Sequence, residues 1–170
     1  YAHITSFTSA SIAKALKEDG VFPDLDEETA NSIKEAEDFA QVIEQHIQAK
    51  FDERQKRIDD ALNAGIEVSE IKKYENTIQY LDSIQDDNIS DEGEAGENLR
   101  KQLIYQDFVN RGYSKERALR EVQKSFNAGS DIEDAKEALQ SNKQFFEGLY
   151  DRMIKDAKAE EEREVKERKE

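Results

Sequence analysis

The chain has no cysteine, a single proline and seven glycines among its 170 residues. The lack of cysteine excludes disulfides and thiolate zinc sites, and it removes the residue from which a redox compartment could be inferred. Because proline and glycine break helices, their scarcity indicates long helices with few interruptions. No stretch approaches the roughly 20 apolar residues that a membrane-spanning helix needs, so we expect no membrane partner.

Basic residues are also in short supply, with 25 lysines and arginines against 40 acidic residues and a formal net charge of −15. A charge of this sign repels phosphate backbones, and no face collects enough basic residues to offset it. We therefore expect protein partners and no direct contact with nucleic acid. Hydrophobic residues make up only 36% of the chain, but their periodic spacing predicts folding. This low fraction predicts thin seams between helices instead of one thick core.

The apolar periodicity predicts an all-α, elongated fold with a long helical hairpin, a small helical knot and a long C-terminal helix. The first helix of the hairpin is predicted from about Glu27 to Ala64 and to end at Gly65, and Ser69 is predicted to cap the second. A connection of about four residues between them favours antiparallel packing. The first helix has an apolar row at alternating steps of three and four, the spacing of a coiled-coil seam. We assign this row to partner binding: Ile33, Ala36, Ala40, Ile43 and Ile47.

Four segments follow from these patterns. They are an N-terminal arm with a short helix between Ser9 and Gly20 (1–25), the hairpin (26–85), an acidic linker (86–97), and the knot with its extended C-terminal helix (98–170). The linker prediction depends on the run QDDNISDEGEAGE, which is acidic and holds two glycines. The chain begins at Tyr1 with neither methionine nor a signal-peptide pattern, so we expect a fragment of a longer protein.

In the knot, Gly112 and Gly129 are predicted to end helices and Ser114 to cap one. The last helix is predicted to start at a capping box of Ser130 and Glu133 and to outlast its own apolar stripe. Its densest apolar patch predicts either core packing against the segment 99–109 or a docking surface. We assign a second partner-binding seam to this patch: Phe145, Phe146, Leu149 and Met153.

The acidic linker also has the ligand spacing of a twelve-residue calcium loop, at Asp86, Asn88, Ser90, Glu92, Glu94 and Glu97. The pattern fails where a glycine must turn, because Asp91 stands there. It fails again at the normally apolar position, which is Gly93. An exposed acidic hinge would have the same composition. We therefore expect no metal and no cofactor, with a calcium loop as the alternative.

Catalytic motifs are missing. The chain has two histidines, and His46 is expected to be a surface residue because a metal site needs several converging ligands. We find no nucleophile elbow, phosphate-binding glycine loop or paired HExxH motif, and the carboxylates fall on helix faces that read as exposed. Enzyme activity is therefore not expected.

The segment RGYSKERALREVQKSFNAGSDIEDAKEAL resembles ubiquitin-associated (UBA) domains, with a Gly-Tyr turn at Gly112 and Tyr113 followed by two helices. Such domains are compact three-helix bundles. Here the third helix is predicted to continue for forty residues, so ordinary helix-turn-helix packing is the alternative.

The runs IAKALKEDGVFPDLDEE at Ile12 to Glu28 and LRKQLIYQDFVNRGYSKERALREVQKSFNAGSDIEDAKEAL at Leu99 to Leu139, with the charged terminal helix, resemble tailed-phage proteins. The similar proteins are acidic helical scaffolding and internal head proteins, virion proteins of crAss-like phages among them. The resemblance implies self-association through helices, contact with capsid or portal subunits, and a place in the host cytoplasm, virion or procapsid. The mixed-charge tail departs from the basic hook of many scaffolds and argues against capsid contact there. The leading hypothesis is an assembly protein, and the alternative is a regulatory adaptor that binds a protein through its C-terminal region.

Overall fold

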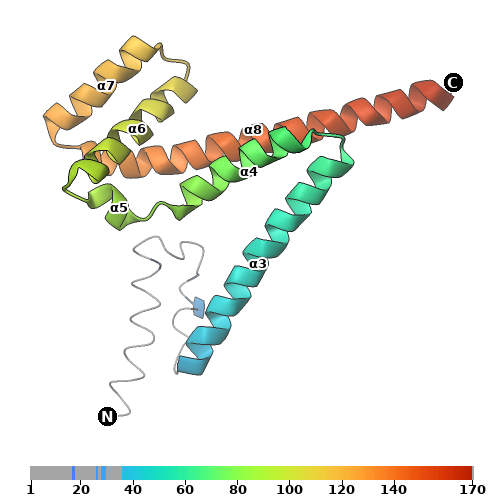
Figure 1. Cartoon of the computed structure of the whole chain (residues 1–170), viewed down its shortest axis with the longest axis horizontal. Coiled ribbons are helices and arrows are strands. Elements are labelled where there is room, and N and C mark those ends of the chain that lie inside the picture. The colour runs from blue at the N-terminus through green and yellow to red at the C-terminus, as the bar shows by residue number, and fades with distance from the viewer. Residues whose placement is uncertain (1–16, 18–25, 27, 30–35, 170) are drawn as a thin grey trace. The chain divides into compact units, whose positions relative to one another are not determined.

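The computed structural model describes residues 17, 26, 28–29 and 36–169, and every regular element in that part of the chain is a helix (Figure 1). This confirms the predicted all-α class and the long C-terminal helix. Of the short helix predicted between Ser9 and Gly20, only Lys17 is described, and it is helical. The predicted arm and Ile33 lie outside the described residues. The helices run as α3 (Ala36–Asn63), α4 (Val68–Ser83), α5 (Asp86–Ser90), α6 (Glu94–Asn110), α7 (Lys115–Ala128) and α8 (Asp131–Lys169).

Glycines end three of these helices, as predicted. Gly65, Gly112 and Gly129 have φ angles of 83°, 94° and 71°, in the left-handed region that costs other residues free energy. Ser114 caps α7, and its hydroxyl accepts a hydrogen bond from the Arg117 main-chain N–H at 3.3 Å.

Two predicted caps are wrong. Helix α4 begins at Val68, and Glu67 is the residue before its first turn, so Ser69 lies inside the helix. At the start of α8 the Ser130 hydroxyl donates to the Asp134 carboxylate at 2.8 Å, and Glu133 takes no part. The nearby Ser125 hydroxyl donates to the same carboxylate. Sequence spacing does not reveal this arrangement, because Ser125 lies on α7 and reaches Asp134 only through the packing of α7 against α8.

The chain divides within α3 into two compact units, 1–59 and 60–170. In the second unit α4, α5, α6 and α7 all contact α8. The predicted hairpin domain 26–85 is therefore not a compact unit, because α4 packs along α8. The apolar face of α4 meets the longer apolar stripe of α8, where Tyr74 stacks on Tyr150 with ring centroids 5.2 Å apart.

Helices α4 and α8 run antiparallel (Figure 1). Partly exposed ion pairs of this length contribute little free energy, so the apolar contacts hold the two helices together. Three such pairs reach α8, with N···O distances of 3.7–4.0 Å, from the end of α3, from α4 and from the start of α5, respectively: Asp60–Lys158, Asp82–Lys143 and Asp86–Lys136.

A core forms where α4, α5, α6 and α7 meet the first half of α8, so the expectation of thin seams is wrong for that part of the second unit. Outside this core, α4 and α8 bury further apolar residues, among them Ile71, Ile78 and Ile154. Helices from several directions converge on the first half of α8, and each apolar face therefore meets more than one neighbour. The core residues are at most 7% exposed: Leu81, Ile84, Ile89, Leu103, Ile104, Val122, Ala135, Ala138 and Leu139.

Candidate partner-binding site

The segment 86–97, predicted to be an acidic linker, is folded. It forms α5 and the first turn of α6, and Ile89 is completely buried in the core. The side chains of Gln85 and Asn88 close a reciprocal capping box at the start of α5. The calcium-loop alternative does not fit, because most of its expected ligands lie on two helices. Residues 86–97 thus form a corner between α5 and α6. Most of its acidic side chains are exposed, whereas Ile89 points into the apolar core.

Arg100 holds this corner in place and is only 7% exposed. Its Nε donates to Asp131 Oδ2 at 2.7 Å, and its Nη1 donates to the carbonyl oxygens of Ile89 at 2.7 Å and Asp91 at 2.8 Å. The guanidinium thus ties α5 and the following turn to α6 and α8. A buried arginine is tolerated only when its donors are satisfied in this way.

Gly96 lets the corner close against α6. A Cβ built on Gly96 would lie 2.0 Å from the carbonyl oxygen of Asp91, which is the same oxygen that accepts from Arg100. Only glycine leaves room for this approach. The linker prediction rests in part on Gly96, and Arg100 is not among the residues singled out from the sequence. The available signal is Ile89, the one large apolar residue in the polar run 85–97.

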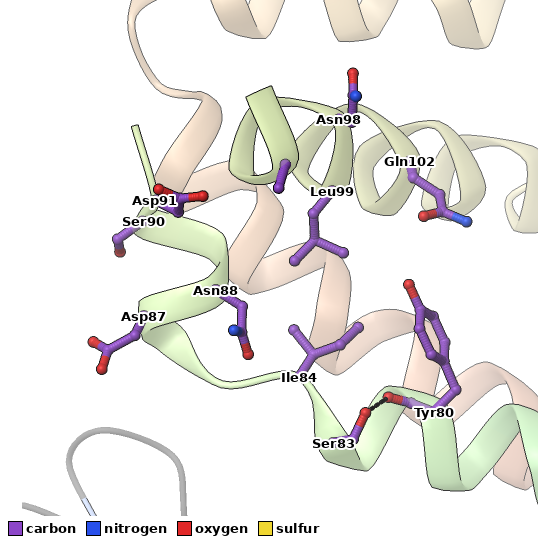
Figure 2. Close-up of a pocket in the computed structure, with 11 residues that line it drawn as sticks. Tyr80, Ser83, Ile84, Asp87, Asn88, Ser90, Asp91, Asn98, Leu99 and Gln102 are labelled. Atoms are coloured by element: carbon purple, nitrogen blue, oxygen red, sulfur yellow. Dashed lines mark hydrogen bonds between the residues drawn. The ribbon is translucent and has the colours of Figure 1, made fainter. Parts of the chain in front are cut away.

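A groove lies between α4 and α6, with α5 closing one end. Both helices lie on α8 and share little contact with each other, which leaves a cavity of about 880 Å³ between them. Figure 2 shows Leu99 reaching from α6 towards Ile84, while Tyr80 and Gln102 lie at the end away from α5. The lining residues are Tyr80, Ser83, Ile84, Asp87, Asn88, Ser90, Asp91, Ala95, Asn98, Leu99 and Gln102.

The groove has an apolar floor and an acidic end. Ile84, Leu99 and Ala95 supply the apolar surface, whereas Asp87 and Asp91 supply two carboxylates, and no lysine or arginine lines the cavity. Among the described residues, Asp87 has no ion-pair partner. Chemically, such a groove suits an apolar side chain that is flanked by cations.

The first predicted seam lies on α3. Ala36 begins the helix, Ala40 is exposed, Ile43 is half-buried, and Ile47 is 57% exposed. Three of these residues, Ala40, Ile43 and Ile47, line one shallow cavity of about 410 Å³ together with Phe39, Glu44 and Gln48. One turn further on, Phe51 is 60% exposed. The structure thus places Ala40, Ile43 and Ile47 along one side of α3, with Ala40 and Ile47 exposed and Ile43 half-buried.

The second predicted seam is largely used inside the protein. Phe146 packs against the core, and Leu149 and Met153 are half-buried. Phe145 is 37% exposed and contacts Phe146 edge to face, with centroids 5.4 Å apart. This patch offers less accessible apolar surface than the row on α3.

His46 is half-buried on α3. Across the described ranges, no group of three or more histidine and acidic side chains lies close enough to hold a metal ion. None of the described helices is long and apolar enough to cross a bilayer. No protein-family model, no curated protein and no solved structure matches this chain.

Proposed function

We propose that this is a structural assembly protein that works by helix-to-helix association with further copies of itself, in the manner of a phage capsid scaffold. The observation that carries the proposal is the exposed apolar row on α3. An aliphatic side chain such as Ile47, left 57% exposed, gains free energy when a second helix covers it.

The spacing of the row favours a helical occupant. Ala36, Ala40, Ile43 and Ile47 repeat at steps of four, three and four, so one side of α3 stays apolar over several turns. At 28 residues, α3 is about 42 Å long at 1.5 Å per residue. That length is enough for a stable pairing with another helix.

The charge of α3 favours a second copy of the chain in antiparallel orientation. Residues 36–49 carry three acidic side chains and no lysine or arginine, whereas residues 50–63 carry four basic and four acidic side chains, a net charge of 4 − 4 = 0. Antiparallel pairing sets the acidic half of each copy against the neutral half of the other, whereas parallel pairing would bring the two acidic halves together, so the antiparallel orientation is favoured.

The test is the mass of the full chain against concentration, measured by light scattering after size exclusion. The wild type should gain mass with concentration, and Ile47→Asp should abolish most of that gain. Val165→Asp is the matched control, because Val165 is another exposed aliphatic residue on a helix, at 43%. A wild type that stays monomeric throughout, or a Val165→Asp effect as large as that of Ile47→Asp, would refute the proposal.

A second candidate function is a regulatory adaptor that binds a ubiquitin-like protein. The observation in its favour is the packing of α6, α7 and α8 on one another around the Gly112 turn, where Phe108 contacts Tyr113 with centroids 5.1 Å apart. Calorimetric titration with ubiquitin distinguishes the two functions. A saturable one-to-one complex supports the adaptor, and no heat signal at millimolar ubiquitin excludes it.

A further inference from the structure

We infer that the groove between α4 and α6 receives helix α7 of a second copy, with Leu119 as the anchor, so that copies join head to tail. This inference rests on the proposed function, because it names a second contact in the same self-association. It concerns surfaces in residues 60–170 and does not involve the row on α3.

Among the large apolar side chains of residues 60–170, Leu119 is the most exposed. It is 60% exposed on α7, although α7 buries Ala118 and Val122 on its inner face. Since Leu119 follows Ala118 directly, it points well away from that inner face on a helix of 3.6 residues per turn. The packing inside one copy therefore leaves this leucine to solvent.

The charges around Leu119 are opposite to those of the groove. Helix α7 carries four basic and two acidic residues in a chain of net charge −15. Lys115 lies one turn before Leu119 and Arg120 directly follows it, while Glu116 offsets one of these charges. In the described part of the chain, neither Lys115 nor Arg120 has an ion-pair partner.

The start of α7 also complements the acidic end of the groove in charge. The N-terminus of a helix carries a partial positive charge, and Lys115 is the first residue of α7. With Leu119 on the floor between Ile84 and Leu99, we place Lys115 at the acidic end of the groove, near Asp87. Exposed ion pairs add little affinity, so Leu119 supplies the binding and Lys115 sets the direction.

A copy cannot fill its own groove. Figure 1 shows α7 and α5 on opposite sides of α6, and the groove lies on the α5 side. The anchor and the groove are thus two different surfaces of one molecule. Such a contact leaves a free anchor at one end and a free groove at the other, and it repeats into a chain or a ring.

Two full-chain variants test the contact, both made with Ile47→Asp so that the row on α3 does not contribute. Leu119→Asp removes the anchor, and Ala95→Trp fills the groove from an exposed position. Ile47→Asp alone should still associate at high concentration in sedimentation equilibrium. Each added change should lower the association constant by at least about tenfold, the effect of losing the burial of one leucine.

Mixing the two variants gives the decisive result. One keeps its groove and the other keeps its anchor, so the mixture should form a one-to-one dimer and nothing larger. A mixture that stays monomeric, or variants that associate as strongly as Ile47→Asp alone, would overturn the inference. Complete loss of association in Ile47→Asp alone would overturn it too and leave the proposed function standing. A monomeric wild type would refute both.

A charge exchange covers the case in which Leu119→Asp or Ala95→Trp fails to fold by circular dichroism. Lys115→Glu and Asp87→Lys should each weaken association about two- to fivefold, the range of an exposed ion pair. The double variant should recover the original strength. Additive weakening in the double variant would show that these two residues do not meet.

Discussion

Gly96→Ala gives the sharpest test of the structure, because packing and helix propensity predict opposite signs. Alanine is favoured over glycine inside a helix by about 1 kcal/mol, so propensity predicts a more stable protein. The structure predicts a less stable one. The new methyl carbon would lie 2.0 Å from the Asp91 carbonyl oxygen, and relief to 3.0 Å requires a backbone shift of at least 3.0 − 2.0 = 1.0 Å.

The shift also disturbs Arg100, whose Nη1 donates to that oxygen at 2.8 Å. A hydrogen bond to a buried charged group contributes about 1.5 to 3 kcal/mol, and overpacking costs about 1 to 3 kcal/mol. After the gain in propensity, the free energy of unfolding should fall by about 1.5 to 5 kcal/mol. At about 4 °C per kcal/mol for a unit of this size, Tm should fall by roughly 6 to 20 °C.

The assay is urea and thermal unfolding of the full chain, followed by circular dichroism at 222 nm. Gly148→Ala is the matched control, because Gly148 lies inside α8 and a Cβ there meets nothing within 4 Å. This control should raise stability by about 0.5 to 1 kcal/mol. If Gly96→Ala is as stable as the wild type, the close approach of the 86–97 corner to α6 is wrong.

Three further predictions concern the core and pH. Arg100→Ala should lower the free energy of unfolding by about 3 to 5 kcal/mol in urea, because it leaves the 15%-exposed Asp131 side chain without its cation. Tyr150→Ala should cost about 3 to 5 kcal/mol in the same assay, since this ring is fully buried and stacked; a cost below about 1 kcal/mol would contradict the α4–α8 packing. Hydrogen bonds from Thr29 lower the pKa of Asp26 below 3.8, so the stability it adds is present above pH 3.8 and is lost as pH falls through the lowered pKa. A carboxyl NMR titration giving 3.8 or higher for Asp26 would contradict that contact.

Individual helices were within reach of the sequence because their determinants are local. The alternation of three and four along α3 and the left-handed glycines at 65, 112 and 129 depend on neighbours a few residues away. The capping role of Ser114 was readable for the same reason. Ser130 was misjudged because its partner, Asp134, is shared with a serine from another helix.

The groove and the corner were out of reach because distant residues decide them. Residues 86–97 look like a linker when read alone, and distant contacts make them a folded corner: Ile89 enters the core, and Arg100 bridges to Asp131 across 31 positions. The chain by itself determined that it would be helical, acidic and cysteine-free. Tertiary structure decided that α4 pairs with α8, and it thereby opened the groove beside α6. Helix formation depends on contacts within a few turns, whereas the choice of partner depends on which apolar faces meet once all helices are present.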